Sequence, residues 1–187
     1  MSVANPALRA IQAGALIALA FLVGCTPPTP NKPDGAKKSE AVGAADKNEE
    51  EIKTAFAALQ SAVKAEDVDK IWGLLAKDSQ DEAEREAKVV RDGFGKLTNK
   101  KKAAFQEKMG LSAKEMTEMT GKLYLKSKPF TEEVDDLPDS KLDKVVVAGE
   151  SATVHYTDEE GKRETIDVVR EQGQWKFDVS VPKAVLK

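Results

Sequence analysis

Apolar residues recur at helical spacing in the stretch that starts just before residue 50. Four of them are separated by steps of four, three and four residues, which places them on one face of an amphipathic helix. They are Ile52, Phe56, Leu59 and Val63. The pattern predicts a helix that begins near Glu49.

Shorter helical segments are predicted to follow. Asp67 stands where an N-cap residue would start a second short helix. Ser112 and Glu115 have the spacing of a capping box, with Leu111 as the apolar residue before them, and predict the start of a fifth helix. The apolar faces of the later helices are formed by Val68, Ile71, Trp72 and Leu75, by Ala83, Ala87, Val90 and Phe94 (helix 80–94), by residues 103–109, and by Met116, Met119, Leu123 and Tyr124.

The pattern changes after Pro129. An acidic stretch surrounds Pro138 and is interpreted as a solvated loop, because it lacks the spacing of an EF-hand. Alternating apolar and polar residues then predict four short strands with glycines at the turns. The strands are expected at 143–148, 151–157, 163–171 and 174–181, with turns at Gly149, Gly161 and Gly173.

The strand pairing can be predicted from the turns. A two-residue loop at Gln172-Gly173 puts the apolar residues of the last two strands on one face. A five-residue loop at 158–162 and a turn at Gly149-Glu150 extend that face across the sheet. The expected pairs are Arg170/Trp175, Val168/Phe177, Ile166/Val179, Val154/Ile166, Ala152/Val168, Val145/Val154 and Val147/Ala152. We expect an α+β fold, cone-like, with N-terminal helices packed on one face of a C-terminal four-stranded antiparallel sheet.

The N-terminus carries a second kind of apolar segment. Residues 10–23 form an apolar run that is preceded by Arg9 and ends at Cys25, the only cysteine. A transmembrane helix needs about 20 apolar residues, and this run is shorter and contains Gln12. The layout is that of a secretory signal peptide over residues 1–24.

Leu22-Val23-Gly24-Cys25 resembles the lipobox of bacterial lipoproteins. The resemblance implies lipid attachment at Cys25 and cleavage before it, so that the membrane is a partner through the lipid anchor. Two or three acyl chains hold a protein stably on a bilayer. Thr26 follows the cysteine where an aspartate would signal inner-membrane retention, which favours the outer membrane if the cell has two.

Composition supports one tethered domain. Residues 25–48 are rich in Pro, Lys, Gly, Ala and Asp, which predicts a flexible linker, and residues 49–187 are expected to form the domain. Without the first 24 residues the chain has 163 residues, with 28 bases against 32 acids. This mild acidity argues against nucleic acid as a partner.

Three titratable residues are expected on the polar face of the sheet. Asp167 would lie directly opposite Asp178, with His155 diagonal to Asp167 and Lys144 across from His155. Opposed like charges are unfavourable, so a cation, a protonated His155 or Lys144 would compensate. One histidine and two carboxylates are also able to ligate a metal. The alternative is a solvated outer face, and we predict no metal site.

No catalytic set is evident. The chain has one histidine and no Gly-x-Ser-x-Gly motif, and Cys25 would be acylated. Acid–base catalysis would need a carboxylate on the apolar face of the sheet. Asp143, expected opposite Tyr156, is the one candidate, and its alternative role is to mark an exposed strand end. No cofactor is predicted.

The segment Ala65-Glu66-Asp67-Val68 before Ile71-Trp72, and the last hairpin 170–177 with its Gly-Gln-Trp-Lys sequence, resemble the nuclear-transport-factor-2-like superfamily. That resemblance implies a cone with a pocket between helices and curved sheet. A pocket would be formed by Trp72, Tyr124, Asp143 and Trp175. We expect a binding or accessory domain for an envelope protein or small ligand; the alternative is an isomerase or dehydratase that uses a pocket carboxylate.

A basic stretch covers residues 96–128. It contains nine lysines against three glutamates. Such a stretch could meet anionic lipid or an envelope polymer. The alternative is a solvated set of helix faces.

Overall fold

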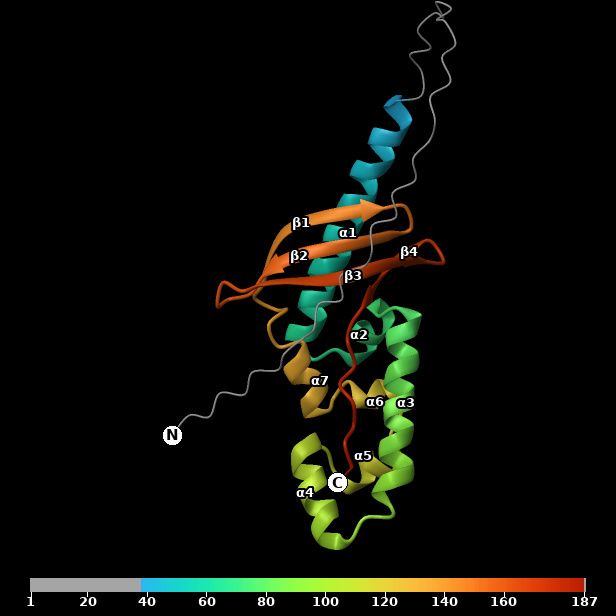
Figure 1. The fold of residues 1–187 in the computed structure, drawn as a ribbon, viewed down its shortest axis with the longest axis vertical. Coiled ribbons are helices and arrows are strands. Elements are labelled where there is room, and N and C mark those ends of the chain that lie inside the picture. The colour runs from blue at the N-terminus through green and yellow to red at the C-terminus, as the bar shows by residue number, and fades with distance from the viewer. Residues whose placement is uncertain (1–37, 187) are drawn as a thin grey trace, which may run out of the picture. The chain divides into compact units, whose positions relative to one another are not determined.

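The computed structural model describes residues 38–186, with side chains from residue 46 onward. The predicted signal peptide, Cys25 and the linker as far as residue 37 lie outside the described residues. Seven helices and four strands follow one another in the described part (Figure 1). They are α1 (Lys38–Lys64), α2 (Val68–Leu74), α3 (Lys77–Phe94), α4 (Asn99–Met109), α5 (Ala113–Thr117), α6 (Gly121–Tyr124), α7 (Lys128–Glu133), β1 (Lys141–Ala148), β2 (Ser151–Thr157), β3 (Arg163–Glu171) and β4 (Gln174–Asp178).

The expected α+β fold is confirmed. The four strands form one antiparallel sheet in the order β1-β2-β3-β4, and α1 lies along the sheet (Figure 1). The apolar face is buried and the other face is largely exposed. The ring of Phe56 on α1 lies 5.7 Å from that of Tyr156 and 6.2 Å from that of Phe177. Aromatic packing therefore joins α1 to the sheet.

The predicted pairing agrees with the structure at six of the seven expected pairs. Ile166/Val179 is not formed, because β4 ends at Asp178. Gln172 and Gly173 have φ values of 51° and 79°, the two positive values of a two-residue hairpin turn. Glycine takes this conformation without strain, and the turn fixes which face of β4 meets α1.

The expected pairing of Asp143 with Tyr156 was wrong. Leu142 pairs with Tyr156 and Lys144 with His155, so that Asp143 is the extra residue of a β-bulge. A bulge inserts one unpaired residue and shifts the register of its strand. Asp143 is exposed and accepts a hydrogen bond from the Thr157 hydroxyl at 2.7 Å.

α1 begins at Lys38, earlier than the expected start near Glu49. The added residues include three Ala, two Lys and one Glu, all of which favour helices. Lys47 lies 3.8 Å from Glu51 one turn later, and such a pair supports an exposed helix modestly. Residues 38–48 therefore continue α1 ahead of its expected start.

The middle of the chain follows the cap signals closely. Asp67 accepts a hydrogen bond from the Lys70 amide and caps α2. Both bonds of the capping box between Ser112 and Glu115 are present at α5. The single helix expected after Ser112 is instead two short ones, because Thr120 caps a new start at Gly121.

The acidic stretch after Pro129 begins inside a helix and not in a loop. α7 starts with Pro at its first or second position, where the missing amide costs nothing. Its Phe130 is fully buried. Helices α3 to α7 pack on one another and extend the core beyond the sheet.

The C-terminal segment 179–186 joins the sheet to the helices. The Ser79 hydroxyl accepts from the Val179 amide at 2.9 Å and donates to Asp178 at 2.8 Å. The Ala184 amide donates to the Glu86 carboxylate at 2.7 Å. Among residues 38–186, no helix has both the length and the apolar character required to cross a membrane.

Candidate functional site

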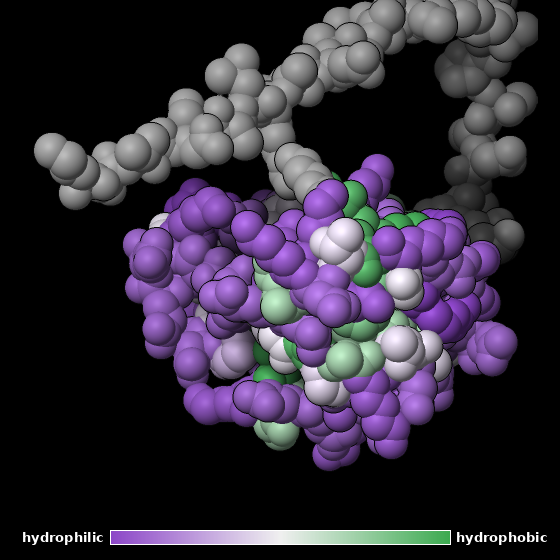
Figure 2. Space-filling model, turned by 90° about the horizontal axis from the view of Figure 1, so that it is seen from below, coloured by the Kyte–Doolittle hydropathy of each residue, from purple (hydrophilic) through white to green (hydrophobic). Residues whose placement is uncertain are grey.

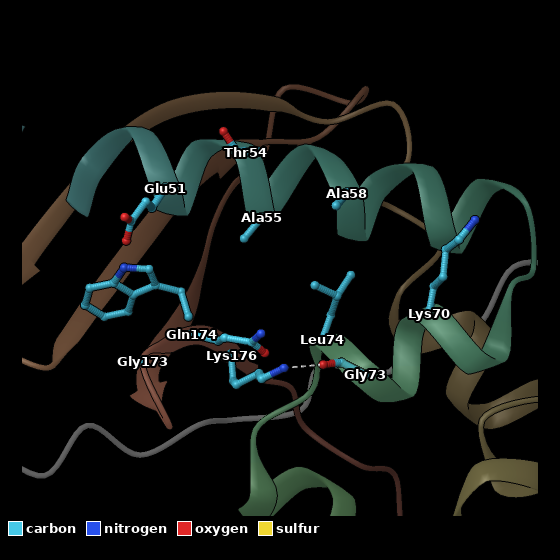
Figure 3. Close-up of a pocket in the computed structure, with 11 residues that line it drawn as sticks. Glu51, Thr54, Ala55, Ala58, Lys70, Gly73, Leu74, Gly173, Gln174 and Lys176 are labelled. Carbon is cyan, nitrogen blue, oxygen red and sulfur yellow. Dashed lines mark hydrogen bonds between the residues drawn. The ribbon is translucent and has the colours of Figure 1, made fainter. Parts of the chain in front are cut away.

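A groove runs between α1, α2 and the β3–β4 hairpin (Figure 3). It is open to solvent and has a volume of about 530 Å³, which is within the usual size range of small-molecule sites. Its apolar surface comes from Ala55 and Ala58 of α1, Leu74 of α2 and Trp175 of β4. The hairpin turn and the two helices therefore build the groove from parts of the chain that are far apart in sequence.

Trp175 is the largest side chain of the groove. It is 5% exposed, and the guanidinium of Arg170 lies 5.5 Å from the centre of its ring. Arg170 is held in turn by Glu51, at 3.8 Å, and by the side-chain oxygen of Asn48, at 3.4 Å. The two partners on α1 and the cation over the ring fix the indole in one position.

The indole N–H of Trp175 has no hydrogen-bond partner among the residues that the structure describes. A buried donor without a partner costs free energy, on the order of 1–3 kcal/mol. The nitrogen atom is itself buried, so a ligand oxygen would reach this donor only after the neighbouring side chains had moved.

The rim of the groove is polar and charged. The Lys176 ammonium donates to the Gly73 carbonyl at the end of α2 (Figure 3). Lys70 is exposed and lies 2.9 Å from Asp67, a pair that water screens strongly. Gln174 adds an amide at the turn. An apolar floor with a few polar groups at its edge is typical of a ligand site.

The other residues of the predicted pocket do not join Trp175. Trp72 is half-buried on α2, and its carbonyl accepts from the Gln80 side chain at 2.7 Å. Tyr124 is fully buried on α6, and Asp143 is exposed on β1. None of these three lines the groove.

Tyr124 serves the packing of the C-terminal segment. Its hydroxyl donates to the Pro182 carbonyl at 2.5 Å. Burial, with a smaller contribution from the charge of Glu86, raises the pKa of Tyr124 to about 12. The hydroxyl therefore keeps its proton, and remains a donor, at all physiological pH values.

A second cavity of about 410 Å³ lies among the end of α1, α2 and α7. Its walls are mostly apolar, whereas Glu66, Lys126 and Asp135 are exposed at its edge. These charges have both signs and do not select a ligand class. The apolar walls are Val63, Val68, Ile71, Leu125, Phe130, Val134 and Pro138.

On the polar face of the sheet, the charges of Asp167 and Asp178 are compensated by groups other than those expected from the sequence. Asp167 does pair with Asp178, but two hydroxyls donate to them: Thr153 to Asp167 at 3.0 Å and Ser79 to Asp178 at 2.8 Å. Across residues 38–186, no three His, Cys, Asp or Glu side chains gather closely enough to hold a metal ion. Hydroxyl donors partly compensate the opposed charges.

Sequence reasoning selected Trp175 but missed its neighbours in the groove. Ala55 and Ala58 were not selected, because small residues beside an apolar helix face are common. Their spacing of three residues places them on one side of α1, where small side chains leave room beside a large one, and this spacing was the available signal.

Comparison of the chain with protein-family models, with curated proteins and with solved structures finds no match.

Proposed function

We propose that this chain is a lipoprotein of the bacterial cell envelope, whose folded domain binds a ligand or partner in the groove beside Trp175. The observation that carries the binding role is the buried indole N–H without a partner on Trp175, a residue that lines the groove. The lipobox-like Leu22-Val23-Gly24-Cys25 supports the tether. An outer-membrane location, if the cell has two membranes, is part of the same proposal.

The groove favours a particular ligand chemistry. Apolar atoms would lie on Ala55, Ala58 and Leu74, and each buried methylene contributes about 0.8 kcal/mol. An acceptor oxygen would take the indole N–H of Trp175. The ligand is therefore a small amphiphilic molecule, or an apolar side chain of a partner protein next to a carbonyl.

We also propose that the domain is related to the nuclear-transport-factor-2-like superfamily. Members of that superfamily open a pocket between helix and sheet. Here Phe56, Tyr156 and Phe177 occupy the space between α1 and the sheet. The groove beside Trp175 lies along the edge of that layer, where α2 meets β4, and we propose it as the site in place of an interior pocket.

The tether can be tested at Cys25. Cys25→Ala should leave an uncut precursor that migrates more slowly than the mature protein, because the lipidated thiol is the signal for cleavage. Expression in bacteria with labelled palmitate, followed by gel electrophoresis, provides the measurement. Label in the wild type and none in the variant supports the anchor, whereas label in both would refute attachment at this residue.

The groove can be blocked without disturbing the core. Ala58 is exposed on α1, so that Ala58→Trp should fill the groove and leave stability within about 0.5 kcal/mol. Ala57→Trp is the matched control, because Ala57 is also exposed and does not line the groove. Both variants and the wild type would be used to capture material from solubilised envelopes.

Mass spectrometry should find a protein or small molecule that the wild type and Ala57→Trp retain and that Ala58→Trp loses. Trp175→Phe should lose the same species, because phenylalanine keeps the apolar ring and removes the N–H. Equal retention by all four proteins would show that the groove is not the binding site.

A further inference from the structure

Charge is distributed unevenly along this chain. Residues 96–114 contain six lysines and one glutamate, a net charge of +5. The whole chain has a formal net charge of −3, so the rest of it carries −8. A local excess of one sign on a protein of the opposite sign points to a partner of complementary charge.

The lysines of this stretch gather at the end of the helices where α3 turns into α4. This basic tip consists of Lys96, Lys100, Lys101 and Lys102, whereas Lys108 lies in the last turn of α4. Lys102 lies 5.6 Å from the ring centre of Phe94. Within the described part of the chain, no carboxylate lies within ion-pairing distance of any of these four tip lysines.

Many lysines elsewhere are paired. Those on α1 contact Glu49, Glu50, Glu51 or Asp139, and those on α3 contact acids one turn later. The tip has one glutamate in its own helix, Glu107. Its positive charge is therefore not neutralised locally and remains available to a partner.

Exposed apolar side chains lie beside the same end. The described part of the chain exposes three large apolar residues, and two of them, Val89 on α3 and Val185 in the C-terminal segment, are each 44% exposed. Gly93 lies one helical turn after Val89, and Leu186 packs directly on it. Phe94, the next residue of α3, packs on Phe105 of α4, with 6.4 Å between the centres of the two rings.

Figure 2 shows the molecule from the side on which α4 lies in Figure 1. Pale and green residues form a patch on this face, with hydrophilic residues around it. A binding partner that offered only negative charge would use the lysines and leave the valines in water. A bilayer surface offers both anionic headgroups and an apolar boundary.

We propose that the basic tip docks on an anionic phospholipid surface, with its lysines on the headgroups and Val89 and Val185 at the acyl boundary. Each lysine near such a surface contributes about 1 kcal/mol. The contact is separate from the lipid on Cys25 and from the groove beside Trp175. It would orient the tethered domain against a membrane.

The test uses the full chain with Cys25→Ser, which removes both the anchor and the natural thiol. A cysteine introduced by Ala104→Cys, an exposed position on α4, receives an environment-sensitive fluorophore. A second chain carries the label at Ser151→Cys, exposed at the start of β2 on the sheet. Both chains keep the same apolar N-terminus, so only the position of the label differs.

Vesicles of phosphatidylglycerol and phosphatidylcholine should shift the emission of the label at 104 to shorter wavelength. Pure phosphatidylcholine should not, and about 0.5 M salt should abolish the shift because it screens exposed charges. The label at 151 should not respond. An equal response at both positions, or an equal response to neutral vesicles, would overturn the proposal.

Two pairs of variants separate the contributions of charge and apolar surface. Lys100→Gln with Lys101→Gln should weaken vesicle binding about thirtyfold. Lys47→Gln with Lys64→Gln removes the same charge from exposed positions of α1 and should have little effect. Equal losses from both pairs would mean that net charge, and not the tip, determines binding.

Val89→Ser with Val185→Ser should weaken vesicle binding about tenfold. Val146→Ser is the control, because Val146 is 47% exposed on the sheet. Soluble polyphosphate should leave the emission unchanged. If polyphosphate alone reproduces the shift, or if Val146→Ser has the same effect as the tip variants, the surface is not a lipid-docking site.

Discussion

Trp175→Ala is expected to lower the free energy of unfolding by about 3–5 kcal/mol, the usual cost of removing a buried tryptophan. The side chain is 5% exposed and lies under Arg170. Since the total free energy of unfolding of a native protein is about 5–15 kcal/mol, this substitution would remove a large part of the stability. Urea unfolding followed by circular dichroism measures the change.

The control for this experiment is the neighbouring residue on the other face of β4. Gln174 is exposed, so Gln174→Ala should change the free energy of unfolding by no more than about 0.5 kcal/mol. Trp175→Phe should lose less than Trp175→Ala, because the ring still fills the space. Equal, small losses from Gln174→Ala and Trp175→Ala would mean that the indole does not pack against α1, and the groove as described would not exist.

Gly121→Val is expected to destabilise the protein by about 3 kcal/mol, the upper part of the range for overpacking. Gly121 starts α6 and is buried against α3. A Cβ atom at this position would lie 2.8 Å from the backbone nitrogen of Glu84. Two helix backbones would have to move apart, which thermal unfolding would record as a lower Tm.

Gly95→Ala is the matched control. Gly95 ends α3 with a φ of −59°, and a Cβ atom there meets nothing within 4 Å. Replacing a glycine in an ordinary helical conformation stabilises a protein by about 0.4–1 kcal/mol. If Gly121→Val were as well tolerated as Gly95→Ala, α3 and α6 would not be packed as closely as described.

Local signals in the sequence predicted the sheet well. The turn at Gln172-Gly173 fixed the register of β3 and β4, and the alternation of apolar residues fixed the face that packs on α1. The capping box at Ser112 gave a helix start for the same reason: its residues interact with one another. Turns, strand faces and helix caps depend on residues that are close together in the sequence, so they can be predicted from it.

The errors arose where tertiary contacts or weak local preferences decide. Asp143 looked like a regular strand residue, because a bulge without glycine leaves no mark in the pattern. The turn between α5 and α6 depends on Thr120 as a cap and on Gly121 meeting α3. A helix start at Lys38 follows from helix propensity without any apolar stripe.

The candidate site was predictable only in part. The alternation along the last strand placed Trp175 on the helical side of the sheet. Arg170 was also expected near its ring, and the structure places it there. The groove itself depends on the position of α2 relative to α1, which no periodicity contains. The absence of a partner for the indole N–H is likewise a property of the packed structure.

The C-terminal segment has a consequence for the order of folding. The bonds from Ser79 to Asp178 and Val179, and from Glu86 to Ala184, join residues 98 to 100 positions apart. Contacts of such long range close late, because the loop entropy must be lost before they form. The contacts of α3 with residues 178–184 can therefore form only after the last strand has been synthesised. A chain that is still being synthesised would therefore hold α3 without these C-terminal contacts until β4 and the residues after it had emerged.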